Sequence, residues 1–253
     1  MHHPALLPLI IAFQLLTRIP TPQVDKISPF ELGRSLLYYP IVGLVIGLIL
    51  ALSNWLLFTA TIEVTAVLLL IVWVAITGAL HLDGLGDSAD AWVGGYNDRQ
   101  RTLEIMKDPY CGPVAVCTIL VVLLGKYASL QHITEHSQYL ALIFIPIISR
   151  SFILVLFLTT PYVRQQGLGE SLASHLPRRH AWLVVLGASI TSLLLLRLDG
   201  LVLLVSAIIS FVALRYWMIK RISGTTGDTA GAMVEILEMV MLLSFSLFCL
   251  HNY

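Results

Sequence analysis

The chain has little charge and few cysteines. Only 12% of its 253 residues are Asp, Glu, Lys or Arg, about half the share found in a soluble domain. The 15 acidic and 15 basic side chains cancel, so no basic excess indicates nucleic-acid binding. Cys111, Cys117 and Cys249 show no metal-binding spacing and are expected to be small apolar side chains. The first residues carry no basic segment and no small-residue cleavage site, so we expect no removable signal peptide.

Apolar residues dominate instead, at 57% of the chain with a mean hydropathy of +0.86. A bilayer-crossing helix needs about 20 mostly apolar residues, and such runs predict an all-α, polytopic membrane protein forming one domain over 1–253. We expect about seven spans, within a range of six to eight. The segment 4–17 is short and contains two prolines, and whether it spans, re-enters or lies in the interface is left open. The predicted spans are 36–59, 64–80, 113–131, 138–160, 181–196, 200–219 and 229–250.

Basic residues alternate along the chain with connections that have almost none. The connections 60–63 and 132–137 have none, and 197–199 has Arg197 alone. Because Lys and Arg favour the cytoplasmic side, the basic connections are expected to be cytoplasmic. They contain Arg18, Lys26 and Arg34, then Arg99, Arg101 and Lys107, then Arg164, Arg178 and Arg179, then Arg215, Lys220 and Arg221.

The segment His81–Asp90 places three carboxylates directly after an apolar run. On a helix, Asp83, Asp87 and Asp90 share one face at i, i+4 and i+7. Like charges this close require cations, and hard oxygen ligands favour Mg²⁺ or Mn²⁺. The alternative is a solvated acidic loop at the membrane surface. His81 would lie on another face, where we expect it to support packing rather than bind metal.

A second charged segment follows in the same connection. Glu104 and Asp108 are spaced i, i+4, and Arg101 lies one turn before Glu104. One interpretation is a surface helix with ordinary ion pairs. The other places Arg99, Arg101 and Lys107 across a bound phosphate and metal from the aspartates.

A third segment, Ser223–Ala232, is rich in glycine and threonine and contains Asp228. Glycines allow backbone amides to approach an anion at a helix N-terminus, although Asp228 could simply cap the helix. Glu235 and Glu238 follow within an apolar run and share a face with Asp228. Because carboxylates inside a span are costly, we expect both glutamates to point into a cavity that opens to the cytoplasm.

Two basic residues also fall within predicted spans. Arg150 needs a partner there, either as a structural pair with a glutamate or as a phosphate clamp. Lys126 could snorkel to the interface instead. We expect one of them to pair with Glu235 or Glu238. We also expect Asp228 to lie within about 10 Å of Asp87 or Asp90, close enough to share a metal site.

Together these motifs resemble the cobalamin synthase family, the adenosylcobinamide-GDP ribazoletransferases. Small departures are Gly86, where alanine is common, and Ser223, where glycine is common; neither removes an ionisable group. The matching segments are Gln14–Pro20, Gly78–Asp90, Leu103–Asp108 and Thr226–Ala232.

The resemblance implies an Mg²⁺-dependent transferase of the bacterial inner membrane with its active site on the cytoplasmic side. It would join adenosylcobinamide-GDP to α-ribazole or α-ribazole 5′-phosphate with release of GMP; a homo-oligomer is left open. Asp83, Asp87, Asp90 and Asp228 would hold the metal. Asp83 or Asp87 would accept the proton of the attacking hydroxyl, while Lys107, Arg101 or Arg150 would stabilise the leaving GMP. The expected substrate-binding residues are Arg18, Arg99, Glu104, Asp108, Arg150, Thr226, Gly227, Glu235 and Glu238.

A cation-coupled transporter is the alternative class, with Glu235, Glu238 and Arg150 on an ion path. No inverted repeat is visible in the sequence, and the motifs gather on one side of the membrane, which favours an enzyme. A purely structural scaffold does not explain three aspartates on one helix face.

Overall fold

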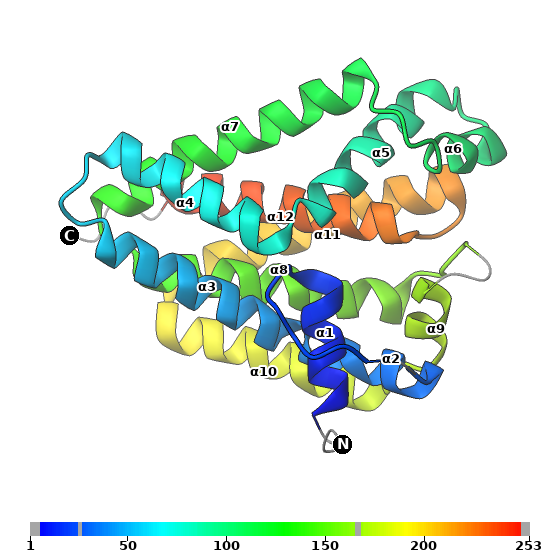
Figure 1. The fold of residues 1–253 in the computed structure, drawn as a ribbon, viewed down its shortest axis with the longest axis horizontal. Helices are drawn as coiled ribbons and strands as arrows, with labels where there is room; N and C mark the ends of the chain where they lie inside the picture. The colour runs from blue at the N-terminus through cyan, green and yellow to red at the C-terminus, as the bar shows by residue number, and fades with distance from the viewer. Residues whose placement is uncertain (1–5, 25–26, 165–167, 249–253) are drawn as a thin grey trace.

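The computed structural model describes residues 6–24, 27–164 and 168–248, and this part of the chain is almost entirely helical (Figure 1). The prediction of an all-α membrane protein is confirmed. The helices are α1 (Leu7–Leu16), α2 (Pro29–Ser35), the 3-10 turn η1 (Leu36–Tyr38), α3 (Tyr39–Leu56), α4 (Ile62–Thr77), α5 (Leu80–Gly94), α6 (Arg99–Ile105), α7 (Pro113–Glu135), α8 (Tyr139–Thr159), α9 (Leu168–Ser174), α10 (Arg178–Leu196), α11 (Leu198–Ile222) and α12 (Gly227–Phe248).

Six helical segments of the described chain are long and apolar enough to cross a bilayer, and a bent pair, α4 with α5, brings the number to seven. This agrees with the predicted range of six to eight spans and makes the chain a multi-pass membrane protein. Helix α1 has ten residues, about 15 Å of helix against a hydrocarbon core of about 30 Å. It is therefore shorter than a span requires, which disfavours the spanning alternative for this segment.

The predicted span 64–80 corresponds largely to α4, which ends in a sharp bend. Its 16 residues cover about 24 Å, and α5 continues after a bend of 87°. Two successive left-handed residues make the break, Gly78 with φ 61° and Ala79 with φ 57°. The backbone N–H of Arg18 donates to the Ile76 carbonyl at 2.7 Å and holds the end of α4 in place. The aspartate motif thus lies on a helix that begins within the bundle.

Helix α8 is the centre of the bundle and is buried along most of its length. Helices α3, α10 and α12 pack around it. Helix α3 approaches very closely, since a Cβ atom on Gly43 would lie 2.3 Å from the Pro146 carbonyl oxygen and one on Gly47 would lie 2.6 Å from the Ile143 Cα. Small residues permit such close packing between membrane helices.

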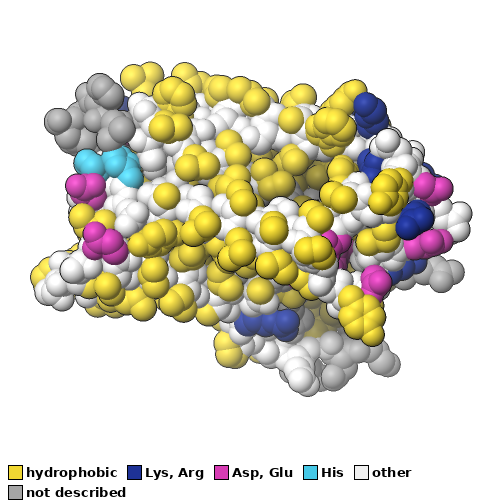
Figure 2. Space-filling model, turned by 90° about the horizontal axis from the view of Figure 1, so that it is seen from above, with side chains coloured by type: hydrophobic (Ala, Val, Ile, Leu, Met, Phe, Trp, Pro, Cys, Tyr) yellow, Lys and Arg dark blue, Asp and Glu magenta, His cyan; other side chains and the backbone are white. Residues whose placement is uncertain are grey.

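The alternating direction of the helices gathers four segments at one end of the bundle, to the right in Figure 1: α5, α6, the loop 160–164 and the start of α12. We call this the carboxylate end, because Asp83, Asp87 and Asp228 lie there. In Figure 2 most visible Lys and Arg side chains gather at this end, while the middle of the face is hydrophobic. The charged motifs therefore gather at one end of the bundle.

Candidate active site

Helices α5 and α12 bring two distant motifs into backbone contact. A Cβ atom on Gly84 would lie 2.7 Å from the Asp228 carbonyl oxygen and 2.9 Å from its Cα. Because Gly84 lies between Asp83 and Asp87 on α5, the predicted convergence of these aspartates with Asp228 is confirmed. The negative charges of Asp83 and Asp228 both act on Asp87. Asp83 is exposed, whereas Asp87 and Asp228 are half-buried.

Arg164 lies at the site although no sequence pattern indicated it. Its Nη2 lies 2.6 Å from Asp228 Oδ2 and donates to the Met106 carbonyl at 3.3 Å. Arg164 therefore joins α12 to the end of α6. No spacing in the sequence signals this role; Arg164 is one of several basic residues in its connection.

A short backbone pairing places Arg164 beside α12. The N–H of Thr225 donates to the Pro161 carbonyl at 2.8 Å, and the N–H of Val163 donates to the Thr225 carbonyl at 3.0 Å. Gly224 is required here, since a Cβ atom would lie 2.2 Å from the Pro161 oxygen. Gly224 thus allows the loop 160–164 to pack against the start of α12, and its role is not to contact a ligand.

Thr226, not Asp228, caps α12. The Thr229 N–H donates to the Thr226 hydroxyl at 3.2 Å, and the Thr226 N–H donates to the Thr229 hydroxyl at 2.8 Å. Thr226 is fully buried, so its predicted contact with substrate is wrong for the side chain. Gly227 is exposed, and nothing lies within 4 Å of the position a Cβ would take. Its backbone is open to a ligand at the helix N-terminus.

Asp90 is turned towards another helix. Its Oδ2 accepts from the Gly112 N–H at 2.6 Å and its Oδ1 from the Ala115 N–H at 2.9 Å. It therefore satisfies two free donors at the start of α7, as a capping carboxylate does. The prediction that Asp90 binds metal does not fit this arrangement, because both oxygens already serve α7.

Arg99, Arg101 and Lys107, on α6 and just after it, form no ion pair with an aspartate within the described part of the chain. Arg99 donates through Nε to the Ile222 carbonyl at 2.9 Å and ties α6 to α11. The Arg101 guanidinium lies 5.6 Å from the centre of the Tyr96 ring. Lys107 is exposed. The predicted grouping of all three around a phosphate is not present among the described side chains.

The acidic residues of the same segment form local contacts. Glu104 accepts from the Gln100 amide at 2.9 Å, and Asp108 accepts from the Tyr110 N–H at 3.1 Å. These are ordinary bonds of an exposed segment. They support the first interpretation of this stretch, a surface helix, rather than a substrate-binding role for its carboxylates.

Glu235 and Glu238 belong to a closed ionic cluster. Lys126 Nζ lies 2.7 Å from Glu235 Oε2 and 2.6 Å from Glu238 Oε2, and Arg150 Nη1 pairs with Glu238 Oε1. The expected pairing with Lys126 or Arg150 is confirmed. The expected open cavity is wrong, because the exposed fractions are 3% for Glu235 and 0% for both Glu238 and Arg150. In this structure their burial leaves none of the three side chains open to a substrate.

Two further residues support the helix break that precedes the aspartates. The side-chain stem of Arg18 packs over Gly78, where a Cβ would lie 2.2 Å from the Arg18 Cγ. His81 is buried at the start of α5 against Gly231 of α12. His81 therefore supports packing, as expected. Arg18 lies at the α4–α5 bend rather than against the aspartates in the contacts described.

The carboxylates suit a hard cation that also binds phosphate. Asp83, Asp87 and Asp228 offer only oxygen, the donor that Mg²⁺ prefers. Arg164 Nε has no hydrogen-bond partner among the described residues, while Nη2 of the same guanidinium already pairs with Asp228 Oδ2. A free guanidinium N–H beside three carboxylates fits an anion held next to a metal ion.

The carboxylate oxygens of Asp83, Asp87 and Asp228 do not all lie within 4.8 Å of one another, so they are spaced more widely than the ligands of one compact metal site. Within the described ranges, one trio of His, Cys, Asp or Glu has ligand atoms that all lie within 4.8 Å of one another: His132, Glu135 and His136. It lies at the end of α7, with His136 just beyond the last helical residue. Mg²⁺ typically takes one or two carboxylates and completes its shell with water and substrate phosphates. The wider arrangement leaves room for such phosphate ligands.

Comparison with known proteins gives a consistent picture. The family model described as cobalamin-5-phosphate synthase matches residues 8–246. A protein of Pseudomonas fluorescens (strain Pf0-1) named adenosylcobinamide-GDP ribazoletransferase is 51% identical over 243 residues, covering 96% of this chain and all of that protein. Proteins of the same name from Pseudomonas entomophila (strain L48) and Stutzerimonas stutzeri (strain A1501) are each 49% identical over 96% of this chain and cover 99% and 98% of their own lengths. No solved structure matches.

Proposed function

The chain belongs to the cobalamin-5-phosphate synthase family, and we propose that it joins adenosylcobinamide-GDP to α-ribazole or α-ribazole 5′-phosphate with release of GMP. The observation that carries this proposal at the level of the site is the contact between α5 and α12. It places Asp83 and Asp87 beside the Asp228–Arg164 pair. Carboxylates next to a basic side chain are the groups that phosphoryl transfer requires.

The reaction exchanges one phosphorus–oxygen bond for another. A ribose hydroxyl attacks the corrin-linked phosphorus, the bridging bond of the pyrophosphate breaks, and GMP leaves with the electron pair. Asp83 is the exposed carboxylate of the cluster and is placed to accept the hydroxyl proton. Arg164 has a free Nε to donate to a phosphate oxygen. The open backbone at Gly227, at the N-terminus of a 22-residue helix, adds a second anion contact.

We assign Mg²⁺ to Asp83, Asp87 and Asp228 and leave Asp90 out of the site. When bound, the ion would neutralise phosphate oxygens as bonds change. Asp87 and Asp228 contribute from different helices, so the protein can hold the cation only while α5 and α12 stay in contact. Catalysis of this kind depends mainly on position and charge.

We further propose that the carboxylate end faces the cytoplasm of a bacterial inner membrane. The connections with Arg99, Arg101 and Lys107, and with Arg215, Lys220 and Arg221, lie at this end. Short loops rich in Lys and Arg stay on the cytoplasmic side. Two large polar substrates would then reach the site from the cytoplasm without crossing the bilayer.

The transporter alternative is not favoured. Lys126 and Arg150 already neutralise Glu235 and Glu238 inside the bundle. An ion path needs intramembrane carboxylates that can exchange partners with a passing cation. A cluster with balanced charge and almost no exposure is suited to holding helices together.

The decisive assay uses the purified full chain in detergent with both substrates, and measures GMP. We expect GMP with Mg²⁺ and none after chelation. Asp83→Asn should lose activity while Asp199→Asn, a carboxylate at the start of α11 and outside the cluster, should keep it. If the protein releases no GMP from adenosylcobinamide-GDP, or releases it equally without divalent metal, the proposed reaction is wrong.

A further inference from the structure

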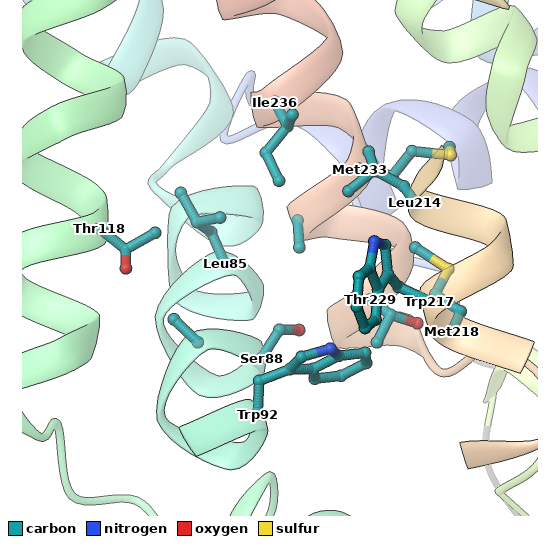
Figure 3. A pocket seen from close by; sticks show the side chains of 12 residues that line it. Leu85, Ser88, Trp92, Thr118, Leu214, Trp217, Met218, Thr229, Met233 and Ile236 are labelled. Atoms are coloured by element: carbon teal, nitrogen blue, oxygen red, sulfur yellow. The ribbon is translucent and has the colours of Figure 1, made fainter. Parts of the chain in front are cut away.

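A second cavity lies behind the aspartates, on the opposite face of α5. It measures about 400 Å³. Figure 3 shows Leu85, Ser88 and Trp92 of α5 on one side of it, Thr118 of α7 beyond them, and Trp217 of α11 on the other side. Since Asp83 and Asp87 occupy the other face of the helix, this cavity does not face these two carboxylates.

The cavity is a groove between membrane spans. Helices α7, α11 and α12 are each long and apolar enough to cross a membrane. Helix α12 packs against both α7 and α11. Trp217 at the rim is 52% exposed, so the groove is not sealed by the protein. What surrounds these spans at this depth is lipid, and the adjacent medium therefore supplies the candidate occupant.

One polar group in the groove lacks a partner. Ser88 is buried, yet its hydroxyl makes no hydrogen bond within the described part of the chain. Figure 3 shows this hydroxyl turned towards Thr229 across the groove. The Thr229 hydroxyl is already engaged with Thr225 and Thr226. An occupant that carries a hydrogen-bond acceptor beside an apolar chain would satisfy Ser88.

The groove continues into a charged opening. A neighbouring cavity of about 340 Å³ shares Trp92 and Trp217 with it and adds Lys220 and Arg221. Arg221 is occupied, donating to the Thr102 hydroxyl at 3.2 Å and to the Trp92 carbonyl. Lys220 lies 5.3 Å from the Trp217 ring centre. Among the described residues it has no carboxylate within 4.0 Å, so its charge is available to an anion.

We propose that this groove binds one anionic glycerophospholipid from the leaflet at the carboxylate end. The groups along the groove follow the same sequence as the parts of such a lipid, from the phosphate to the acyl chain. Lys220 meets the phosphate, Trp92 and Trp217 flank the glycerol region, and the Ser88 hydroxyl donates to an ester carbonyl.

The acyl chain of this lipid runs along α12 from Thr229 to Ile236, about 10 Å of helix, past Leu85 and Met233. The lipid would brace α5 from behind the aspartates. Its position opposite Asp83 and Asp87 means that it need not leave when substrates bind.

Native mass spectrometry of the full chain tests this, after equilibration with equal amounts of phosphatidylglycerol and phosphatidylcholine. We expect one retained phospholipid with a preference for phosphatidylglycerol. Lys220→Gln should reduce that preference about fivefold. Ser88→Ala should reduce retention of both lipids by a similar factor of about five, the scale of one hydrogen bond.

Two control variants remove a charge or a hydroxyl outside the groove. Arg179→Gln removes an exposed charge from α10, and Ser189→Ala removes a hydroxyl that already donates to Val185 at 2.9 Å. Neither should change retention. A wild-type protein that retains no phospholipid overturns the proposal, as does retention that is indifferent to both Lys220→Gln and Ser88→Ala.

A second measurement does not depend on the Ser88 or Lys220 variants. Phosphatidylglycerol brominated on its acyl chains should quench part of the tryptophan fluorescence at a low lipid ratio, and Trp217→Phe should remove most of the saturable part. Quenching that rises only with bulk lipid content, or that Trp217→Phe leaves unchanged, contradicts a bound lipid in this groove.

Discussion

Gly84→Ala should separate the two motifs of the active site while leaving every charged group in place. The new Cβ would meet the Asp228 carbonyl oxygen at 2.7 Å and its Cα at 2.9 Å, whereas ordinary contact begins at 3.4 Å. Both atoms belong to the backbone, so no side chain can turn away. The helices must therefore part by about 0.7 Å or more at this point.

We expect this shift to reduce turnover by about a hundredfold, because an error of about 1 Å in a reacting geometry has that effect. Overpacking should also lower the free energy of unfolding by about 1–3 kcal/mol. The assay is GMP release per folded molecule, with the melting temperature measured alongside it. These two readouts distinguish a misplaced site from a protein that has unfolded.

Two other glycines provide matched controls. A Cβ on Gly86 would lie 3.2 Å from the Ala115 Cβ and 3.3 Å from the Ile119 Cδ1, and one on Gly187 would meet nothing within 4 Å. All three positions are helical, so the gain in helix propensity is shared. Gly86→Ala and Gly187→Ala should keep activity within about twofold, since neither moves backbone against backbone. If Gly84→Ala is as active as these controls, the close α5–α12 contact is not what builds the site.

Substitutions at four residues separate chemistry from packing. Arg164→Gln should lower turnover about a hundredfold, which is the scale of losing one key electrostatic group. Arg164→Lys keeps the charge and should recover part of that turnover. Equal activity of the wild type and both variants would contradict the role of Arg164. Asp83→Asn should cause a loss on the same scale of about a hundredfold with normal membrane insertion, and activity within a fewfold of wild type would remove Asp83 from the site. Asp90→Asn should lower unfolding stability by about 1 kcal/mol as a weakened helix cap but preserve turnover per folded molecule; loss of metal-dependent turnover without destabilisation would return Asp90 to the metal site. Glu238→Gln should destabilise the protein by about 3–5 kcal/mol, because it leaves buried positive charge uncompensated. An unchanged unfolding transition in detergent would show that the ionic cluster does not hold the bundle together.

The spans could be predicted from the sequence because each is a long apolar run. The α4–α5 break could not, since it depends on Ala79 adopting a left-handed conformation that a non-glycine residue rarely takes. The apolar run alone suggested one span followed by a loop. Contact with Arg18 at Gly78 helps define where the bend falls, and such a contact between distant segments has no local signature.

The carboxylates of the site could also be found from sequence, because Asp83, Asp87 and Asp228 are charges in apolar surroundings. Asp90 shows the limit of helical spacing. It shares the face as predicted, yet the start of α7 returns to it and takes both oxygens. Arg164 was missed for the related reason that only the pairing of loop 160–164 with Thr225 brings it to Asp228.

The glutamates of α12 were half predictable. A carboxylate inside a span needs a cation, which correctly indicated Lys126 and Arg150 as partners. Whether the cluster is open or closed depends on how α7 and α8 pack against α12, and that packing leaves almost no exposure. Charge pattern thus identified the pairs, while tertiary packing decided that they are structural.

The central claim is that carboxylates on α5 and α12 form one catalytic centre, and a double-mutant cycle on GMP release tests it most directly. Asp83→Asn and Asp228→Asn are measured singly and together with Mg²⁺ and both substrates. Groups that act as one unit are strongly non-additive. We therefore predict that the double variant releases GMP only slightly more slowly than the less active of the two single variants. If the two losses multiply, as for independent sites, Asp83 and Asp228 do not share a centre and the account of the active site is wrong.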